Sequence, residues 1–249
     1  MNMESTEKLR GKGVLLVGAS GGIGAATALE MAGAGARLAL AGRDRTKLET
    51  LAAQIEFATG NEPVLLTGDL RVPEEAAALV ENAESAFDGA LDIVINAAGI
   101  GAIRPIENLT VDDFRQVLDS NLLGAMLLSQ AAVKRMAPRK SGHLLHVVGI
   151  LGKAPMANAT AYCASKYGLT GFLQALRAEV SRRYNLKITA LYLGGVDTPF
   201  YDRPSVEMRV QRDKMLTPED AAHAIVFALT QSSHLVLGDL TLQPESHQL

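Results

Sequence analysis

The sequence predicts a three-layer α/β fold: a doubly wound parallel sheet covered on both faces by helices. Short apolar runs alternate with longer helical patterns along the whole chain. The first apolar run leads into a glycine-rich turn and then into a helix of small residues. No linker, repeat or low-complexity segment interrupts the 249 residues, of which 48% are hydrophobic. We therefore expect a single domain over residues 1–249.

The predicted elements follow from apolar runs bounded by turn residues and from helical spacing. Strands are predicted at residues 13–18, 37–41, 63–67, 91–96, 143–148, 187–193 and 235–241. Helices are predicted at residues 22–34, 44–58, 73–87, 111–137, 161–183 and 218–230. The least regular region, residues 197–216, follows the sixth strand and contains Pro199 and Pro204. It is either a substrate lid or a plain surface loop.

Composition narrows the class of function. The net charge is −3 and no basic block occurs, so we expect neither a nucleic-acid partner nor an anionic membrane. No stretch approaches the roughly 18 apolar residues of a membrane span, and residues 1–10 do not resemble a signal peptide. The single cysteine, Cys163, is typical of a reducing cytoplasmic compartment. No metal site is predicted.

A glycine-rich loop joins the first strand to the first helix. It reads Gly18-Ala19-Ser20-Gly21-Gly22-Ile23-Gly24. Glycines at this place permit a tight turn and a close approach of the backbone to phosphate, and the following helix N-terminus offers amide donors. We therefore predict nucleotide binding here, with contacts from Gly18, Ser20, Gly22, Ile23 and Gly24.

Tyr162 and Lys166 are four residues apart in the run Tyr162-Cys163-Ala164-Ser165-Lys166. On a helix this spacing places both side chains on one face. A lysine ammonium near a phenol favours the phenolate, so we expect a lowered pKa for Tyr162. A tyrosine tuned in this way exchanges a proton with an alcohol or carbonyl oxygen near neutral pH.

These motifs together resemble the short-chain dehydrogenase/reductase family, over nearly the whole chain. The glycine loop, Asn96-Ala97-Ala98-Gly99, Asn121 and Tyr162-x-x-x-Lys166 occur in the family's order and at its spacing. The resemblance implies a Rossmann-type, NAD(P)-binding domain of about 250 residues. It also implies that Tyr162 is the general acid/base, that Lys166 binds the nicotinamide ribose, and that Asn121 completes a proton relay.

The resemblance also assigns the remaining cofactor contacts. At the end of the second strand, where an acidic residue is typical of this fold, the chain has Gly42. The next residue is Arg43, and its guanidinium suits a 2′-phosphate. We therefore favour NADP(H) over NAD(H), although Asp44 weakens the case unless it only caps the next helix. Further contacts are implied for Asp69, Leu70, Asn96, Ala97, Val196 and Thr198.

The chain departs from the family pattern at two positions. The serine that normally lies 13 residues before the tyrosine is replaced by Gly149, and Leu193 stands where proline is usual. A comparable hydrogen-bond donor contributes about 10²–10³ in rate. Restoring it with Gly149→Ser should therefore raise carbonyl reduction.

Two hypotheses follow from this gap. The first is an NADP(H)-dependent reductase or alcohol dehydrogenase that acts on a small carbonyl or alcohol, and retention of Asn121, Tyr162 and Lys166 favours it. The second is a nucleotide-binding homologue without turnover, acting as a scaffold or partner subunit.

The substrate pocket and the assembly are also expected from the resemblance. The expected pocket walls are mostly apolar: Ile100, Ile103, Ile150, Leu151, Met156, Val196, Phe200 and Tyr201. Helices 111–137 and 161–183 carry apolar stripes that include Met126, Leu127, Phe172, Leu173 and Leu176. Family members pair through these helices, so we expect a homo-oligomer, a tetramer or a dimer.

Overall fold

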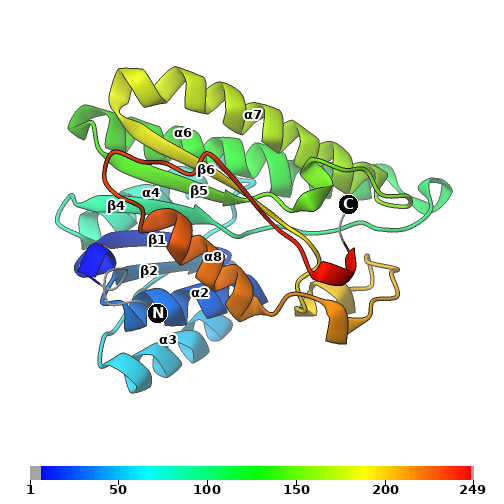
Figure 1. The fold of residues 1–249 in the computed structure, drawn as a ribbon, viewed down its shortest axis with the longest axis horizontal. Coiled ribbons are helices and arrows are strands. Elements are labelled where there is room, and N and C mark those ends of the chain that lie inside the picture. Colours follow the sequence, from blue (N-terminus) through cyan, green and yellow to red (C-terminus); the bar gives the residue numbers. More distant parts are fainter. Residues whose placement is uncertain (1–6, 248–249) are drawn as a thin grey trace.

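A computed structural model describes residues 7–247, and a seven-stranded parallel sheet forms its centre (Figure 1). The strands are Gly13–Val17 (β1), Arg37–Gly42 (β2), Val64–Thr67 (β3), Leu91–Asn96 (β4), Gly142–Val147 (β5), Leu186–Leu193 (β6) and Asp239–Leu242 (β7). Their spatial order is β3-β2-β1-β4-β5-β6-β7, and every neighbouring pair is parallel. This confirms the predicted fold class. The order reverses between β1 and β4, which is where such sheets bind ligands.

Helices cover both faces of the sheet. The longer ones are Gly22–Gly33 (α2), Arg45–Thr59 (α3), Pro73–Ala86 (α4), Val111–Leu118 (α5), Gly124–Met136 (α6), Thr160–Tyr184 (α7) and Pro218–Leu229 (α8). Helices α2, α3 and α8 pack on one face, and α4, α6 and α7 pack on the other (Figure 1). Across residues 7–247, no helix is both long and apolar enough to cross a membrane.

The central strands are apolar on both faces because each face has its own hydrophobic core. In β1, Val14 and Leu16 belong to the core beneath α2 and α8, while Leu15 and Val17 belong to the opposite one. All four side chains are buried. Successive strand residues point to opposite faces, so the uninterrupted apolar run in the sequence is the pattern expected for a strand covered on both sides.

Two predicted elements differ from the observed ones. The helix predicted over residues 111–137 is interrupted by a π-helical turn at Asp119–Leu123. Such a turn inserts an extra residue into the helix and is frequent at functional sites; here it contains Asn121. The last strand begins at Asp239 rather than at residue 235.

The 197–216 segment is fastened to the rest of the molecule at two places. Val196, just before it, forms a parallel bridge with Leu216 at its end. Ile103 and Val206 form a second bridge near its middle. Arg212 also makes ion pairs with two carboxylates of the segment, those of Asp197 and Asp202. The 197–216 segment, the least regular region of the sequence, is therefore a set of short turns held in place by backbone pairing.

Candidate active site at the carboxyl edge of the sheet

The glycine loop is shaped for a close approach of the backbone. Gly18 has φ +80°, and a Cβ placed on it would lie 2.6 Å from Ala98 N. A Cβ on Gly24 would lie 2.2 Å from Gly18 O. Helix α2 begins at Gly22 with no side chain capping it and no acidic residue in its first turn. Its amide donors are therefore free of side-chain competition, as a phosphate-binding helix N-terminus requires.

The end of β2 presents Arg43 beside the loop. Arg43 is exposed, and its Nη1 lies 4.0 Å from Asp69 Oδ2. Asp44 caps α3, since its carboxylate accepts a hydrogen bond from Lys47 N at 3.2 Å. The capping role considered from the sequence is thus confirmed. Ser20 faces the same place, because a Cβ on Gly42 would lie 3.4 Å from Ser20 Oγ.

Asp69 is tightly held by a second arginine. Arg71 donates hydrogen bonds to its carboxylate at 2.5 and 3.0 Å, and this contact lowers the pKa of Asp69 below its usual value. The carboxylate is therefore charged at neutral pH and only weakly engaged with Arg43. Leu70, the next residue, is buried in the core under β1 and β2.

Asn96 joins β4 to β5 through a buried polar network. Its Oδ1 accepts a hydrogen bond from Ala98 N at 3.1 Å, and its Nδ2 lies 3.3 Å from His146 Nδ1. His146 Nε2 lies 3.1 Å from Ser129 Oγ, which itself donates to Ala125 O. These contacts fit a neutral ring protonated on Nε2. Burial agrees, since it lowers the pKa of His146 to about 3, with Lys166 adding to the effect.

Asn121 is buried and fully hydrogen-bonded. Its Oδ1 accepts from Ile100 N and its Nδ2 donates to Ile100 O, both at 2.9 Å. Nδ2 also donates to Ser165 Oγ at 3.1 Å, and that hydroxyl donates to Tyr162 O at 2.7 Å. The amide thus connects the chain after β4 to helix α7 at the turn that carries the tyrosine.

Tyr162 and Lys166 lie together on α7, as predicted. Lys166 is buried, its Nζ donates to Val147 O at 3.3 Å, and it lies 5.5 Å from the centre of the Tyr162 ring. Burial lowers the pKa of Lys166 to about 8. The Tyr162 ring packs against Phe200, with ring centres 5.8 Å apart.

The expectation that Lys166 lowers the pKa of Tyr162 is wrong for this structure. Burial raises the pKa of Tyr162 well above its usual value, Tyr201 and Cys163 raise it further, and Arg203 lowers it. The physical reason is that a phenolate loses its hydration on burial, while the lysine ammonium hydrogen-bonds a backbone carbonyl instead of the phenol. The tyrosine is therefore a neutral proton donor at neutral pH.

Gly149 lies near the Tyr162 hydroxyl. A Cβ placed on it would lie 3.9 Å from Tyr162 Oη and 3.9 Å from Leu193 O. The backbone there has φ +91° and ψ 155°, a conformation that residues with a side chain rarely adopt. A serine at this position would therefore have to adopt a strained backbone conformation or shift the backbone.

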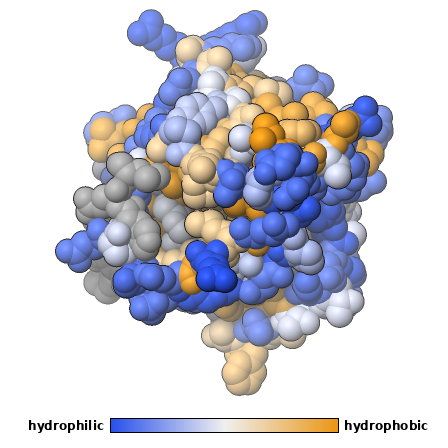
Figure 2. Space-filling model, turned by 90° about the vertical axis from the view of Figure 1, so that its right-hand side faces the viewer, coloured by the Kyte–Doolittle hydropathy of each residue, from blue (hydrophilic) through white to orange (hydrophobic). Residues whose placement is uncertain are grey.

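An apolar cluster surrounds Tyr162 on the side of the 197–216 segment. Six of the eight expected pocket walls belong to it: Ile103, Ile150, Leu151, Met156, Phe200 and Tyr201. Ile100 and Val196 lie in neighbouring clusters. Figure 2 looks onto this edge of the molecule and shows hydrophobic surface between hydrophilic residues.

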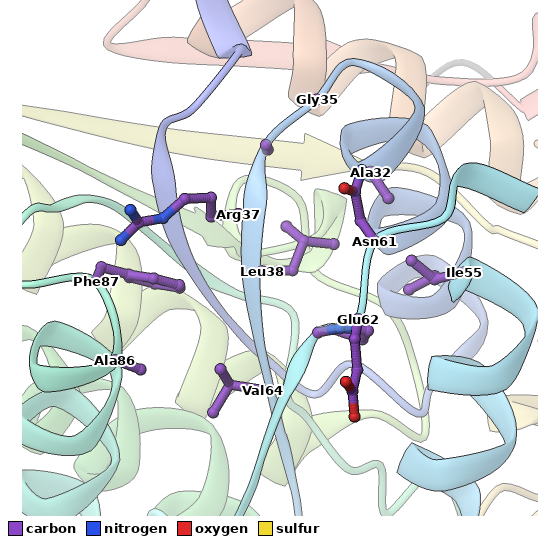
Figure 3. Close-up of a pocket in the computed structure, with 12 residues that line it drawn as sticks. Ala32, Gly35, Arg37, Leu38, Ile55, Asn61, Glu62, Val64, Ala86 and Phe87 are labelled. Carbon is purple, nitrogen blue, oxygen red and sulfur yellow. The ribbon is translucent and has the colours of Figure 1, made fainter.

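A separate hollow of about 230 Å³ lies at the opposite edge of the sheet (Figure 3). It opens beside Arg37, the first residue of β2, and beside Asn61 and Phe87. None of the predicted site residues lines it. Ligands of such sheets bind at the carboxyl ends of the strands, so this hollow is not the candidate site.

The structure brings the predicted residues together and adds others. The glycine loop, Asn96, Asn121, Tyr162 and Lys166 all lie at the carboxyl edge of the sheet. Ser129, Ser165 and Arg203 were not predicted as part of this site. Only Ser165 had a signal in the sequence, since it lies three residues after Tyr162 on the same helix.

The chain is similar in sequence to known short-chain dehydrogenases and oxidoreductases. Residues 12–207 match the family model for short chain dehydrogenases. An uncharacterised oxidoreductase of Staphylococcus aureus (strain MW2) is 33% identical over 236 residues, which cover 95% of this chain and 98% of that protein.

Two solved structures extend the similarity. A metagenomic short-chain oxidoreductase in complex with NADP has a TM-score of 0.81 at 27% identity, covering 95% of this chain and 98% of its own. A short-chain dehydrogenase from Burkholderia cenocepacia J2315, also in complex with NADP, has a TM-score of 0.82 at 28% identity, covering 95% and 97%.

Proposed function

The chain belongs to the short-chain dehydrogenase/reductase family of oxidoreductases, and on this basis we propose an NADP(H)-dependent carbonyl reductase or alcohol dehydrogenase. It transfers a hydride to or from a small carbonyl or alcohol compound. The observation that carries the proposal is that buried Asn121 and Lys166 lie with the partly buried Tyr162 at the same edge of the sheet as the glycine loop. The complexes of two similar proteins with NADP support the choice of cofactor.

The cofactor would lie along the carboxyl edge, and the residues there fit it. Glycine at residues 18 and 24 lets the backbone segments approach closely, and the amides at the start of α2 would bind the diphosphate. Arg43, exposed beside Ser20, would hold the 2′-phosphate. The cofactor contacts expected from the sequence are Gly18, Ser20, Gly22, Ile23, Gly24, Arg43, Asp69, Leu70, Asn96, Ala97, Tyr162, Lys166, Val196 and Thr198.

When bound, the nicotinamide would supply the hydride, and this chain's residues would manage the proton. Tyr162, kept neutral by burial, would donate its proton to the carbonyl oxygen. Lys166, with a pKa of about 8, can carry a charge beside that oxygen as alkoxide character develops. A neutral tyrosine favours reduction over alcohol oxidation, which would require its phenolate.

Steady-state NADPH oxidation tests the proposal against a panel of aldehydes, ketones and diketones. We expect turnover of at least one apolar carbonyl compound, because the cluster around Tyr162 is apolar. We also expect weaker activity with NADH in place of NADPH. No activity with either cofactor across the panel would contradict the proposal.

The alternative function, a nucleotide-binding scaffold without turnover, rests on Gly149. No side chain from that residue reaches the Tyr162 hydroxyl, so the donor that normally stabilises the reacting oxygen is absent there. Loss of one such donor costs about 10²–10³ in rate. That loss is smaller than the whole rate enhancement of a typical enzyme, so we retain the catalytic proposal as the stronger one.

Gly149→Ser tests the effect of the missing side-chain donor directly, with Gly149→Ala as its matched control. Both variants place a Cβ at φ +91°, so both should lose about 1–2 kcal/mol of unfolding free energy. Only the serine adds a donor near Tyr162 Oη. Its carbonyl reductase activity should exceed that of the alanine variant, by up to roughly 10²-fold. Equal activity in the two variants would show that the hydroxyl does not reach the reacting oxygen.

We also propose that the chain forms a homo-oligomer, most simply a tetramer. Of the predicted apolar stripe, Leu173 is buried in the core and is not available to a partner. Exposed apolar side chains remain on the same elements, at Leu118, Leu123 and Tyr167.

Light scattering at micromolar concentration measures the assembly. We expect a mass above that of the 26.4 kDa monomer, and Leu123→Glu should reduce it by placing a charge in the interface. Phe57→Glu is the control, because Phe57 is 95% exposed on α3, away from these helices. A monomeric mass for the unmutated protein would refute the proposal.

A further inference from the structure

The start of the 197–216 segment contacts two parts of the carboxyl edge of the sheet, where the cofactor would lie. At one side, a Cβ placed on Gly22 would lie 2.5 Å from Thr198 Cγ2, so Thr198 touches the glycine loop. At the other side, Arg203 Nη1 donates to Gly99 O at 3.5 Å, in the turn after β4. The short helical turn Pro199–Asp202 (η5) joins the two. A ligand bound along this edge would therefore have the segment against it.

Arg203 makes no ion pair with a carboxylate in the part of the chain that the structure describes. Its guanidinium donates to Gly99 O at 3.5 Å and lies with its carbon 5.9 Å from the centre of the Phe200 ring. Two arginines of or beside the segment are paired with carboxylates: Arg104 pairs with Glu207, and Arg212 pairs with two aspartates. A guanidinium has five donors in a planar fork that suits phosphate. Most of those donors of Arg203 are unused.

The position of Gly99 shows what Arg203 reaches. A Cβ placed on Gly99 would lie 3.4 Å from Asn121 Oδ1 and 3.7 Å from Lys166 Nζ. Arg203 thus approaches the group that surrounds Tyr162. Partial burial and the positive charge of Arg43 both lower the pKa of Arg203. The two arginines, from different elements, therefore repel each other, and an anionic ligand that contacts both would relieve that repulsion.

We propose that Arg203 binds the diphosphate of the nicotinamide cofactor and fastens the 197–216 segment over it. This inference rests on the proposed function. The contact of Thr198 with Gly22 places the segment beside the first residue of α2, whose N-terminal amides would bind the diphosphate. Arg43 directly follows β2, at the place proposed for the 2′-phosphate. In this proposal Arg203 binds the diphosphate, and Arg43 binds the 2′-phosphate.

This division gives the two arginines different signatures. NAD(H) and NADP(H) both contain the diphosphate, but only NADP(H) carries the 2′-phosphate. Substitution of Arg203 should therefore weaken the binding of NAD(H) and of NADP(H) by the same factor. Substitution of Arg43 should weaken the binding of NADP(H) alone.

The test is a fluorescence titration of the full chain with NADPH and with NADH. Arg203→Gln should raise the Kd of each cofactor by roughly tenfold, as expected for one charge-assisted contact at a partly exposed site. Arg203→Lys should retain part of the affinity. Arg209→Gln is the matched control, because Arg209 is an exposed arginine of the same segment, and it should leave both Kd values unchanged.

Limited cleavage by chymotrypsin gives a second measurement that does not depend on activity. NADPH should protect the unmutated protein from cleavage at Phe200 and Tyr201, and Arg203→Gln should lose that protection even when saturated with NADPH. A protease that does not cut at arginine is needed because the substitution itself removes an arginine.

The outcomes separate the inference from the function on which it rests. If the unmutated protein binds neither cofactor, the proposed function fails. If it binds both and Arg203→Gln matches Arg209→Gln, only the inference is overturned. A loss confined to NADPH would move Arg203 to the 2′-phosphate. Unchanged cofactor binding with a raised KM for acidic carbonyl compounds would assign it to a substrate carboxylate. Each of these last two results also overturns the inference.

Discussion

Tyr162→Phe should abolish NADPH-dependent carbonyl reduction while leaving the fold and cofactor binding intact. The substitution keeps the ring that packs on Phe200 and removes only the hydroxyl that faces Gly149. General acid catalysis by a positioned side chain contributes about 10²–10⁴ in rate. A loss at the upper end is expected, because the Gly149 backbone offers no side-chain donor that could replace the phenol.

Tyr184→Phe is the control for this substitution. Tyr184 is the last residue of α7, about six helical turns from Tyr162, and its ring lies against the Arg183 guanidinium. The variant loses the same hydroxyl away from the candidate site, so its activity should stay within a few-fold of that of the unmutated protein. The measurement is kcat/KM for the best carbonyl of the panel, with NADPH binding measured in parallel. Activity that survives Tyr162→Phe would show that the proton comes from another group.

Arg43→Glu should weaken the binding of NADPH roughly ten- to a hundredfold and leave NADH binding nearly unchanged. The substitution replaces a cation with an anion at the place proposed for the 2′-phosphate. A hydrogen bond to a charged group contributes about 1.5–3 kcal/mol, which corresponds to this range of affinity. The glutamate would also stand near Asp69, which is already charged and bound to Arg71.

Arg45→Glu is the control for the charge reversal. It changes the net charge by the same amount two residues further along, but Arg45 points to Glu49 and to Leu65 O within its own part of the fold. Its effect on the NADPH to NADH preference should therefore be small. Titration of both variants with both cofactors measures the preference. Equal affinity of the unmutated protein for the two cofactors would refute the role given to Arg43.

The fold could be predicted wherever the signal was local. Residues 13–18 and the glycines after them specify a buried strand and a tight turn without help from the rest of the chain. The π-helical turn could not be predicted, because Asn121 is held there by both backbone groups of Ile100, 21 residues earlier. The start of β7 was misplaced by four residues for a similar reason. Leu235 and Val236 are apolar but exposed, so their composition alone suggested a strand that tertiary pairing does not form.

The sequence predicted that the site residues lie close together, but it did not predict the direction of the pKa shift of Tyr162. Asn121, Tyr162 and Lys166 lie together because the family spacing fixes their places on neighbouring elements. The sign of the pKa shift of Tyr162 depends on how deeply the ring is buried, and spacing does not report burial. Arg203 escaped prediction because its neighbours, Gly99 and Arg43, are more than 100 residues away in the sequence.

The most direct test of the account is a single-turnover reaction on the protein loaded with NADPH. The protein is first titrated with NADPH to establish binding, and then mixed with a carbonyl compound at a protein concentration above that of the cofactor. The account predicts saturable binding followed by oxidation of the bound NADPH, and it predicts that Tyr162→Phe binds equally well without oxidation. Tight binding with no oxidation by the unmutated protein, for any carbonyl of the panel, would contradict it and assign the chain to the scaffold function.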